Sequence, residues 1–395
     1  MSDASIQAGL RRVSDLEPDA PLPASDPELL ARIRDEIARD GPMTMARFME
    51  LALYDPQAGY YTREPGTAAS GPGGDGDFLT APEGHPIFGW ALARRLERAW
   101  EELGRPDRFV VREHGAGRGA LASAILGGLR RSASQLLEVI HYQAIDVSPR
   151  AARAFAARIE AAGLQAFVEP ADARPAPGAV IANELLDALP VHQVVGGDDG
   201  QVRERFVTLP ADHSGDAGAE PVLACSTGAP STPRLAERLA REGVELAPGQ
   251  VAEVCLDLDD WVAAATRPLE RGQLIVIDYG ADAASLYAAS RGSTLRAYHR
   301  HRVHDDPLVA IGRQDLTAHV DLTALDAAAR AAGLTPGIAT TQAGYLADLG
   351  LGELLVSLQQ GPTADLGAYL QAKAAVVRLL DPRATGRFAV REFER

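Results

Sequence analysis

The stretch 110–126, VVREHGAGRGALASAIL, holds the residues whose types and spacing indicate chemistry most clearly. An apolar run ends at Glu113, and glycines then occupy every second position at Gly115, Gly117 and Gly119. Glycines between a strand and a helix let a ligand approach the backbone, and the N-terminus of the following helix faces anionic groups. The spacing fits a dinucleotide, with Ala120 in the third small position, and it also fits S-adenosyl-L-methionine, which takes an acid two residues before the first glycine.

Acids farther along the chain favour S-adenosyl-L-methionine as the cofactor. Asp146 ends the next apolar run 29 residues after Gly117 (146 − 117), whereas a dinucleotide fingerprint expects its ribose-binding acid after about 20 residues. We expect Asp146 to accept both ribose hydroxyls, with Val147 beside it. Asp172 follows a third run, and we expect it to reach the adenine amine, with Ala173 beside it.

Each of these acids also has a local alternative. Asp146 is placed to cap the next helix, Asp172 to sit in a turn, and Glu113 to form a surface ion pair. The local alternatives do not explain why the acids follow consecutive strands. We therefore predict that Glu113, Asp146 and Asp172 share the rim of one cleft.

The segment ANELLDALP follows the fourth apolar run, where the reacting methyl group would sit. We predict that Asn183 and Glu184 hold the acceptor, with Asn183 also contacting the donor. An arginine acceptor arrives protonated, so a carboxylate must localise its charge before a nitrogen attacks, and Glu184 and Asp187 are placed for that. Asp187 has an equal alternative as a helix N-terminal charge. Asp278 and Tyr279 in VIDYG are expected to form a second wall of the substrate site.

The histidines of AYHRHRVHDD resemble metal ligands at first sight. Arginines alternate with them, and neighbouring positive charges repel a cation. We therefore expect no metal site and interpret His301 as a substrate contact.

The elements that must position these side chains alternate between apolar runs and helices. Strands are predicted over 109–112, 139–145, 165–169, 179–182 and 273–280, and helices over 121–131, 150–162 and 256–272. This alternation predicts an α/β fold with a mostly parallel, Rossmann-like sheet and helices on both faces.

Four regions are expected along the chain: a polar flexible tail (1–27), an N-terminal helical region with a donor-capping loop (28–105), the donor-binding core (106–285) and a C-terminal region that completes the substrate cleft (286–395). The core carries an insertion at about 195–250, where VRERFVTL and PVLACSTG predict a hairpin. After about Ala364 we expect a helix and then a polar, partly disordered end.

Charge and composition exclude several partners. The net charge of −15 argues against a purely electrostatic grip on nucleic acid or anionic lipid. No apolar run approaches the roughly 18 residues of a membrane span. Cys225 and Cys255 indicate no disulfide framework, and residues 1–27 lack the features of signal and transit peptides, so we expect a cytoplasmic protein. A homodimer remains open.

Six stretches in order make the chain resemble the MidA family, which contains a mitochondrial complex I assembly factor that is a protein arginine methyltransferase. They are MTMARFMELALYDPQAGYY (43–61), GDFLTAPEGHPIFG (76–89), EHGAGRGAL (113–121), ANELLDALPVH (182–192), VIDYG (276–280) and TLRAYHRHRVHDDP with GRQDLTAHVDLTAL (294–325). The resemblance as a whole covers about residues 28 to 350.

The resemblance implies a class I S-adenosyl-L-methionine-dependent methyltransferase that acts on protein arginine, with a link to respiratory-complex assembly. It also implies a set of residues lining the cleft beside the donor: Gly76, Asp77, Phe78, Thr80, Pro82 and Glu83. His114 and Ala116 replace the Leu and Pro expected in E-L-G-P-G-R-G, which spares the glycines but removes the ring that pre-sets the turn. A small-molecule acceptor, or a non-catalytic assembly factor that keeps the donor fold, remain alternatives.

Overall fold

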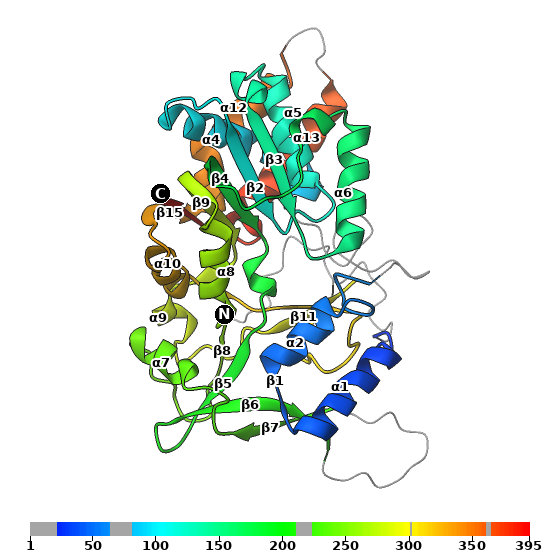
Figure 1. Ribbon diagram of the computed structural model, residues 1–395, viewed down its shortest axis with the longest axis vertical. Coiled ribbons are helices and arrows are strands. Elements are labelled where there is room, and N and C mark those ends of the chain that lie inside the picture. Colours follow the sequence, from blue (N-terminus) through cyan, green and yellow to red (C-terminus); the bar gives the residue numbers. More distant parts are fainter. Residues whose placement is uncertain (1–21, 64–80, 211–222, 301, 361–364) are drawn as a thin grey trace.

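A computed structural model describes residues 22–63, 81–210, 223–300, 302–360 and 365–395. The chain forms an upper lobe around one large sheet and a lower lobe around a second sheet (Figure 1). Predictions for Gly76, Asp77, Phe78, Thr80 and His301 fall outside the described residues.

The upper lobe contains a six-stranded sheet in the order β15-β16-β9-β4-β2-β3. Four strands are mutually parallel: β2 (Phe109–His114), β3 (Ile140–Ile145), β4 (Ala176–Asn183) and β9 (Leu269–Asp278). The strand β16 (Ala389–Glu394) is antiparallel to both of its neighbours, β9 and β15 (Thr335–Thr341). The predicted mostly parallel α/β sheet is confirmed.

Helices cover both faces of this sheet because its strands are apolar on both sides. Ile275 and Ile277 of β9 pack into one core, and Leu274 and Val276 between them pack into another. The first core receives α4 (Ile87–Glu102), α5 (Ala120–Arg131), α11 (Gln342–Asp348), α12 (Leu351–Ser357) and α13 (Leu366–Leu380). The second receives α8 (Asp257–Thr266) and α10 (Leu322–Ala331).

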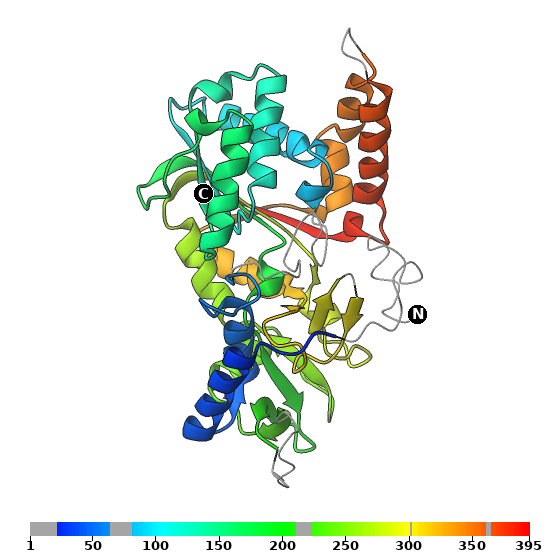
Figure 2. The same ribbon diagram turned by 90° about the vertical axis from the view of Figure 1, so that its right-hand side faces the viewer.

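The lower lobe joins the N-terminal region to the insertion. Its sheet has the order β1-β6-β5-β8, with β7 paired to β6, and α1 and α2 lie against it (Figure 2). The bounds are α1 Pro27–Asp40, β1 Met43–Thr44, α2 Met45–Tyr54, β5 His192–Gly196, β6 Val202–Thr208, β7 Ala224–Gly228, α7 Arg234–Arg241 and β8 Val251–Val254. The predicted hairpin is confirmed by the antiparallel pairing of β6 with β7.

Short elements connect the lobes near the ends of the parallel strands. They are α3 (Ala81–Gly84), α9 (Ala283–Leu286), β10 (Gly280–Ala281) paired with β14 (Val320–Asp321), and β11 (Arg296–His299) between β12 (Arg302–His304) and β13 (Asp315–Thr317). The longer helix α6 (Pro149–Ala161) packs into the first core of the upper lobe through Phe155 and Ile159.

Two predicted elements are wrong. Residues 165–167 form a 3₁₀ turn, and only the bridge between Tyr142 and Val168 joins this segment to the sheet. Pro170 follows directly and lacks the backbone N–H that a ladder needs. The C-terminal end is not a polar tail, because β16 lies inside the sheet with Val390 and Phe393 fully buried.

A buried ion pair explains why β16 reads as polar. Glu392 accepts hydrogen bonds from Arg95 Nε at 3.0 Å and from the Tyr345 hydroxyl, and its side chain is buried. The division at residues 105 and 285 stays a prediction, although β15 and β16 bring residues 335–394 into the main sheet.

Candidate functional site

The glycine turn lies between β2 and α5 at the carboxyl end of the parallel strands. Gly115, Gly117 and Gly119 have φ angles of 69°, 52° and 76°, a region that residues with a side chain rarely adopt. A Cβ on Gly119 would lie 2.7 Å from the Phe155 ring, whereas one on Gly117 would meet nothing nearer than the Gly115 carbonyl oxygen at 3.9 Å. The backbone at Gly117 is therefore open to a ligand.

Asp146 stands directly after β3, beside the glycine turn. Its Oδ2 accepts the Gly117 N–H at 2.8 Å, and its Oδ1 accepts the Ser148 N–H at 2.8 Å. Burial raises the pKa of this carboxyl. Ser148, not Asp146, caps α6, and Val147 between them is 70% exposed. The structure thus brings Asp146 to the glycine turn, with an exposed apolar side chain next to it.

Glu113 lies beneath the turn instead of on an open rim. It is 4% exposed and accepts a hydrogen bond from the Tyr142 hydroxyl at 2.8 Å. Burial raises its pKa to about 8, and the charge of Asp146 acts in the same direction. Glu113 is therefore protonated at neutral pH. Its hydrogen bond with Tyr142 joins β2 to β3 beneath the glycine turn.

Asp172 is not brought together with the other two acids. Paired residues on parallel strands share a face, so Glu113 lies on the face of Ala144 and Tyr142, and Arg112 lies with Gln143 on the other. The Asp172 carboxylate pairs with Arg174 at 2.5 Å and lies 3.8 Å from Arg112. The expectation that Asp172 shares one rim with the other acids stays a prediction, because the segment that carries it makes only an isolated bridge to β3. Contacts of Asp172 and the exposed Ala173 with adenine stay predictions.

A strained turn at the end of β4 carries the predicted acceptor residues. Asn183 ends the strand, Glu184 has a positive φ of 50°, and the 3₁₀ turn Leu186–Ala188 follows. Glu184 Oε1 accepts the Ala81 N–H at 3.1 Å and Asn183 Nδ2 at 3.3 Å. A non-glycine residue in this conformation costs about 1–3 kcal/mol and occurs preferentially at functional sites.

Asp278 holds this acceptor turn in place. Its Oδ2 accepts the backbone N–H groups of Leu185, Leu186 and Asp187 at 3.1, 2.8 and 3.3 Å, and its Oδ1 accepts that of Tyr279 at 2.8 Å. The side chain is only 1% exposed. Backbone donors contact both oxygens of the Asp278 carboxylate, so it positions the turn, and its contact with substrate stays a prediction.

Tyr279, the other half of the expected wall, packs beside the turn. Its ring lies 5.3 Å from that of His319 and 5.4 Å from that of Phe388. Burial and the neighbouring Asp187 raise the pKa of its hydroxyl. Its contact with substrate stays a prediction.

Three neighbouring carboxyls give the acceptor turn its electrostatic character. Burial raises the pKa of Glu184 to about 7 and that of Asp187 to about 6, and it raises that of Asp278 further because Asp187 also repels its charge. Among the described residues, Asn183 Oδ1 and Asp187 Oδ1 are buried acceptors without a hydrogen-bond partner. Such oxygens are normally satisfied, so the set suits a cation rich in N–H donors.

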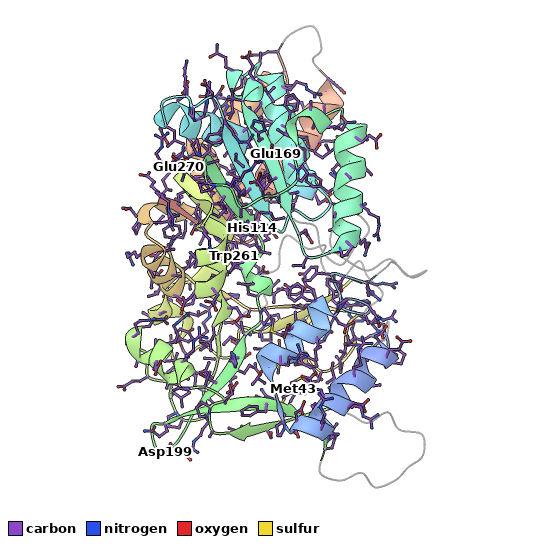
Figure 3. The ribbon with its side chains drawn as sticks, viewed as in Figure 1. Met43, His114, Glu169, Asp199, Trp261 and Glu270 are labelled. Carbon is purple, nitrogen blue, oxygen red and sulfur yellow. The ribbon has the colours of Figure 1, made fainter. Side chains whose placement is uncertain are left out.

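The remaining predicted residues lie around this turn or support it. Pro82 is buried in α3, and Glu83 forms a 3.1 Å ion pair with Arg158 of α6. His114 lies beside Trp261 of α8, with 5.5 Å between ring centroids (Figure 3). Burial lowers the pKa of His114 to about 4, so it stays neutral.

The histidines of the β11–β12 segment have separate roles. His299 Nδ1 lies 2.9 Å from the Arg313 carbonyl oxygen, and His304 lies on the adjacent strand. Within the described part of the chain, no group of three or more His, Cys, Asp or Glu side chains is arranged to hold a metal ion.

Sequence reasoning missed four polar or aromatic residues next to the acceptor turn. Tyr54 donates to the Ala188 carbonyl oxygen at 2.9 Å, and Tyr61 donates to Asp315 Oδ1 at 2.7 Å. Tyr298 lies opposite Asp315 in the pairing of β11 with β13. All four fall in the stretches 43–61 and 294–325 that carry the family resemblance, which was the available signal.

Comparison with known proteins agrees with this geometry. Residues 91–340 match the family described as "Putative S-adenosyl-L-methionine-dependent methyltransferase". The mitochondrial protein arginine methyltransferase NDUFAF7 homolog of Drosophila melanogaster is 31% identical, over 74% of this chain and 68% of that protein. The NDUFAF7 protein arginine methyltransferase of Rattus norvegicus, also mitochondrial, is 30% identical over 82% and 74%.

Two solved structures share this fold, and one of them contains S-adenosyl-homocysteine. A superfamily member from Burkholderia thailandensis bound to S-adenosyl-homocysteine has a TM-score of 0.81 and 32% identity over 95% of each chain. A native structure of a superfamily protein from the same organism has a TM-score of 0.79 with equal identity and coverage. The predicted cofactor, S-adenosyl-L-methionine, is confirmed.

One prediction is overturned by these relatives. The expectation of a cytoplasmic protein is wrong, since the named relatives that match the chain are mitochondrial proteins. Separately, none of the helices among the described residues is long and apolar enough to cross a bilayer.

Proposed function

We propose that this chain, which belongs to the family of S-adenosyl-L-methionine-dependent methyltransferases, transfers the methyl group to an arginine side chain of a protein. The names of the relatives support this acceptor. The observation that carries the proposal is the pair of buried, unpartnered acceptor oxygens, Asn183 Oδ1 and Asp187 Oδ1, at a turn that carries Glu184 and is held by Asp278. The implied link to respiratory-complex assembly stays a prediction.

The residues at the ends of β2 and β3 fit the donor. Gly117 leaves its backbone open, and backbone N–H groups already orient the Asp146 carboxylate toward the glycine turn. Asp146 would hold the ribose hydroxyls, and the exposed Val147 would cover an apolar ring face. The donor supplies a methyl group whose bond to the sulfonium sulfur breaks, with the electron pair retained by sulfur, as the acceptor nitrogen bonds to carbon.

The acceptor turn would bind and orient a guanidinium. An arginine side chain is protonated at all relevant pH values and offers five N–H donors in a plane. Asp187 would localise its positive charge on one side, and Glu184 would contact the nitrogen on the other side that attacks the methyl group. Glu184, with a pKa raised to about 7, would accept the proton that leaves that nitrogen as the new bond forms.

A transfer assay with labelled S-adenosyl-L-methionine tests this proposal. We expect label in protein arginine when lysate protein is offered and none in the small-metabolite fraction. Glu184→Gln should bind S-adenosyl-homocysteine like the wild type but lose transfer, whereas Glu160→Gln on the exposed face of α6 should keep both. Label confined to metabolites, or full turnover by Glu184→Gln, contradicts the proposal.

A further inference from the structure

Three half-buried tyrosines from distant segments approach the acceptor turn. Tyr54, at the end of α2, bonds to the Ala188 carbonyl oxygen and stacks on Tyr61 with 5.6 Å between ring centroids. Tyr61 donates from its hydroxyl to Asp315 Oδ1 at 2.7 Å. The N-terminal helical region is thereby tied to both sides of the turn.

The third tyrosine, Tyr298, lies on β11. It pairs with Asp315 across the ladder of β11 and β13, and the Ala318 N–H that follows β13 donates to the Asp187 carbonyl oxygen at 2.8 Å. Burial raises the pKa of Tyr298 to about 12, and the charges of Asp187 and Asp315 add to the effect.

The same causes raise the pKa values of Tyr54 and Tyr61. We call Tyr54, Tyr61 and Tyr298 with Asp187 and Asp315 the tyrosine cluster. All three phenols are therefore neutral under ordinary conditions, and both carboxylates influence every ring.

Aromatic rings beside carboxylates distinguish between the two cations that protein side chains present, guanidinium and ammonium. A guanidinium is planar, weakly hydrated, stacks on aromatic faces and binds carboxylates through two parallel bonds. An ammonium is a compact, strongly hydrated point charge that loses more solvation when it enters an aromatic site.

We propose that the tyrosine cluster selects a guanidinium over an ammonium, so that this protein methylates arginine and not lysine. The inference rests on the proposed function and adds to it the residues that set acceptor specificity. Tyr279 is not counted in the cluster: its hydroxyl bonds to Asp187, but its ring lies against His319 and Phe388.

Calorimetry with two peptides tests the selection. Both consist of alanine and glycine and differ at one position, arginine or lysine, and both are titrated into protein saturated with S-adenosyl-homocysteine. The wild type should prefer the arginine peptide at least about tenfold, and Tyr298→Leu should reduce that preference about three- to tenfold. Tyr298→Phe keeps the ring and should keep most of the preference.

Matched controls separate specificity from folding. Tyr369→Leu, at a half-buried tyrosine on the distant helix α13, should leave the preference unchanged. Affinity for S-adenosyl-homocysteine should be equal in all variants, which shows that each one is folded.

Two results overturn the selection: an unchanged preference in Tyr298→Leu, or a wild type that binds the arginine peptide no better than the lysine peptide. If either binding result is found but the protein still methylates the arginine peptide, only the role of the tyrosine cluster is refuted. Label found solely in metabolites refutes the proposed function itself.

Discussion

Replacing Glu113 with glutamine should change how the stability of the protein depends on pH. Glu113 is buried beneath the glycine turn, where it accepts a hydrogen bond from the Tyr142 hydroxyl. Burial raises its pKa from 4.5 to about 8. The native state therefore holds a proton that the unfolded state releases between these two pH values, and native stability falls as the pH rises through that window.

The size of the effect follows from the same two values. A difference between 4.5 and about 8, at about 1.4 kcal/mol per pH unit, corresponds to a loss of at most about 5 kcal/mol of unfolding free energy by pH 9. Glutamine keeps the shape and an acceptor for Tyr142 but does not ionise. The glutamine variant should therefore gain stability relative to the wild type as the pH rises from 5 to 9.

Urea denaturation at pH 5, 7 and 9 measures this difference. Other buried carboxyls, such as Asp187 and Asp278, affect both proteins alike, so the difference between the two curves isolates Glu113. Tyr142→Phe removes the hydrogen bond that lowers the Glu113 pKa and should steepen the loss of stability. Parallel pH profiles for the wild type and Glu113→Gln would refute the reasoning.

Further predictions concern backbone geometry, the acceptor turn and the C-terminal strand. Gly119→Ala should lower the unfolding free energy by about 1–3 kcal/mol in urea denaturation, because φ is 76° and its Cβ meets Phe155 at 2.7 Å. Gly127→Ala within α5, where a Cβ meets nothing within 4 Å, should raise the unfolding free energy by up to about 1 kcal/mol. Equal changes in Gly119→Ala and Gly127→Ala would contradict this reasoning. Asp278→Asn replaces one of two acceptor oxygens with a donor and should lower the unfolding free energy by about 1–3 kcal/mol. It should also lower the rate of methyl transfer, so a wild-type kcat would contradict the positioning role of Asp278. Glu392→Ala removes the buried partner of Arg95 and should lower the unfolding free energy by about 3–5 kcal/mol, measured by thermal denaturation. A loss below about 1 kcal/mol would show that β16 does not depend on the pair of Arg95 and Glu392.

Local sequence patterns predicted what depends on neighbours along the chain. Alternating apolar runs and helices predicted β2, β3, β4, β9 and their helices, because these strands are buried on both faces. Asp146 was found by its position after a strand, and the glycine turn by its spacing. The prediction of a strand over 165–169 was wrong because Pro170 interrupts the pairing that the apolar residues of this segment favour.

Those local patterns could not predict contacts between residues that are far apart in the sequence. The polar residues of β16 are explained by distant partners: Arg95, 297 residues away, pairs with Glu392, and Asp282 pairs with Arg391. Tyr61 and Asp315 are separated by 254 residues, so neither signalled the acceptor site alone. The sequence identified Asp278 as a site residue. The backbone groups that donate to it lie 91 to 93 residues earlier, so its role in positioning the turn could be seen only in the structure.

Titration calorimetry with S-adenosyl-homocysteine tests the central claim, that the glycine turn and Asp146 form the donor site. The wild type should bind one molecule per chain, and Asp146→Asn, which loses a charged acceptor while keeping its shape, should bind at least about tenfold more weakly. Equal affinity of wild type and Asp146→Asn, or no binding by the wild type, would contradict the account.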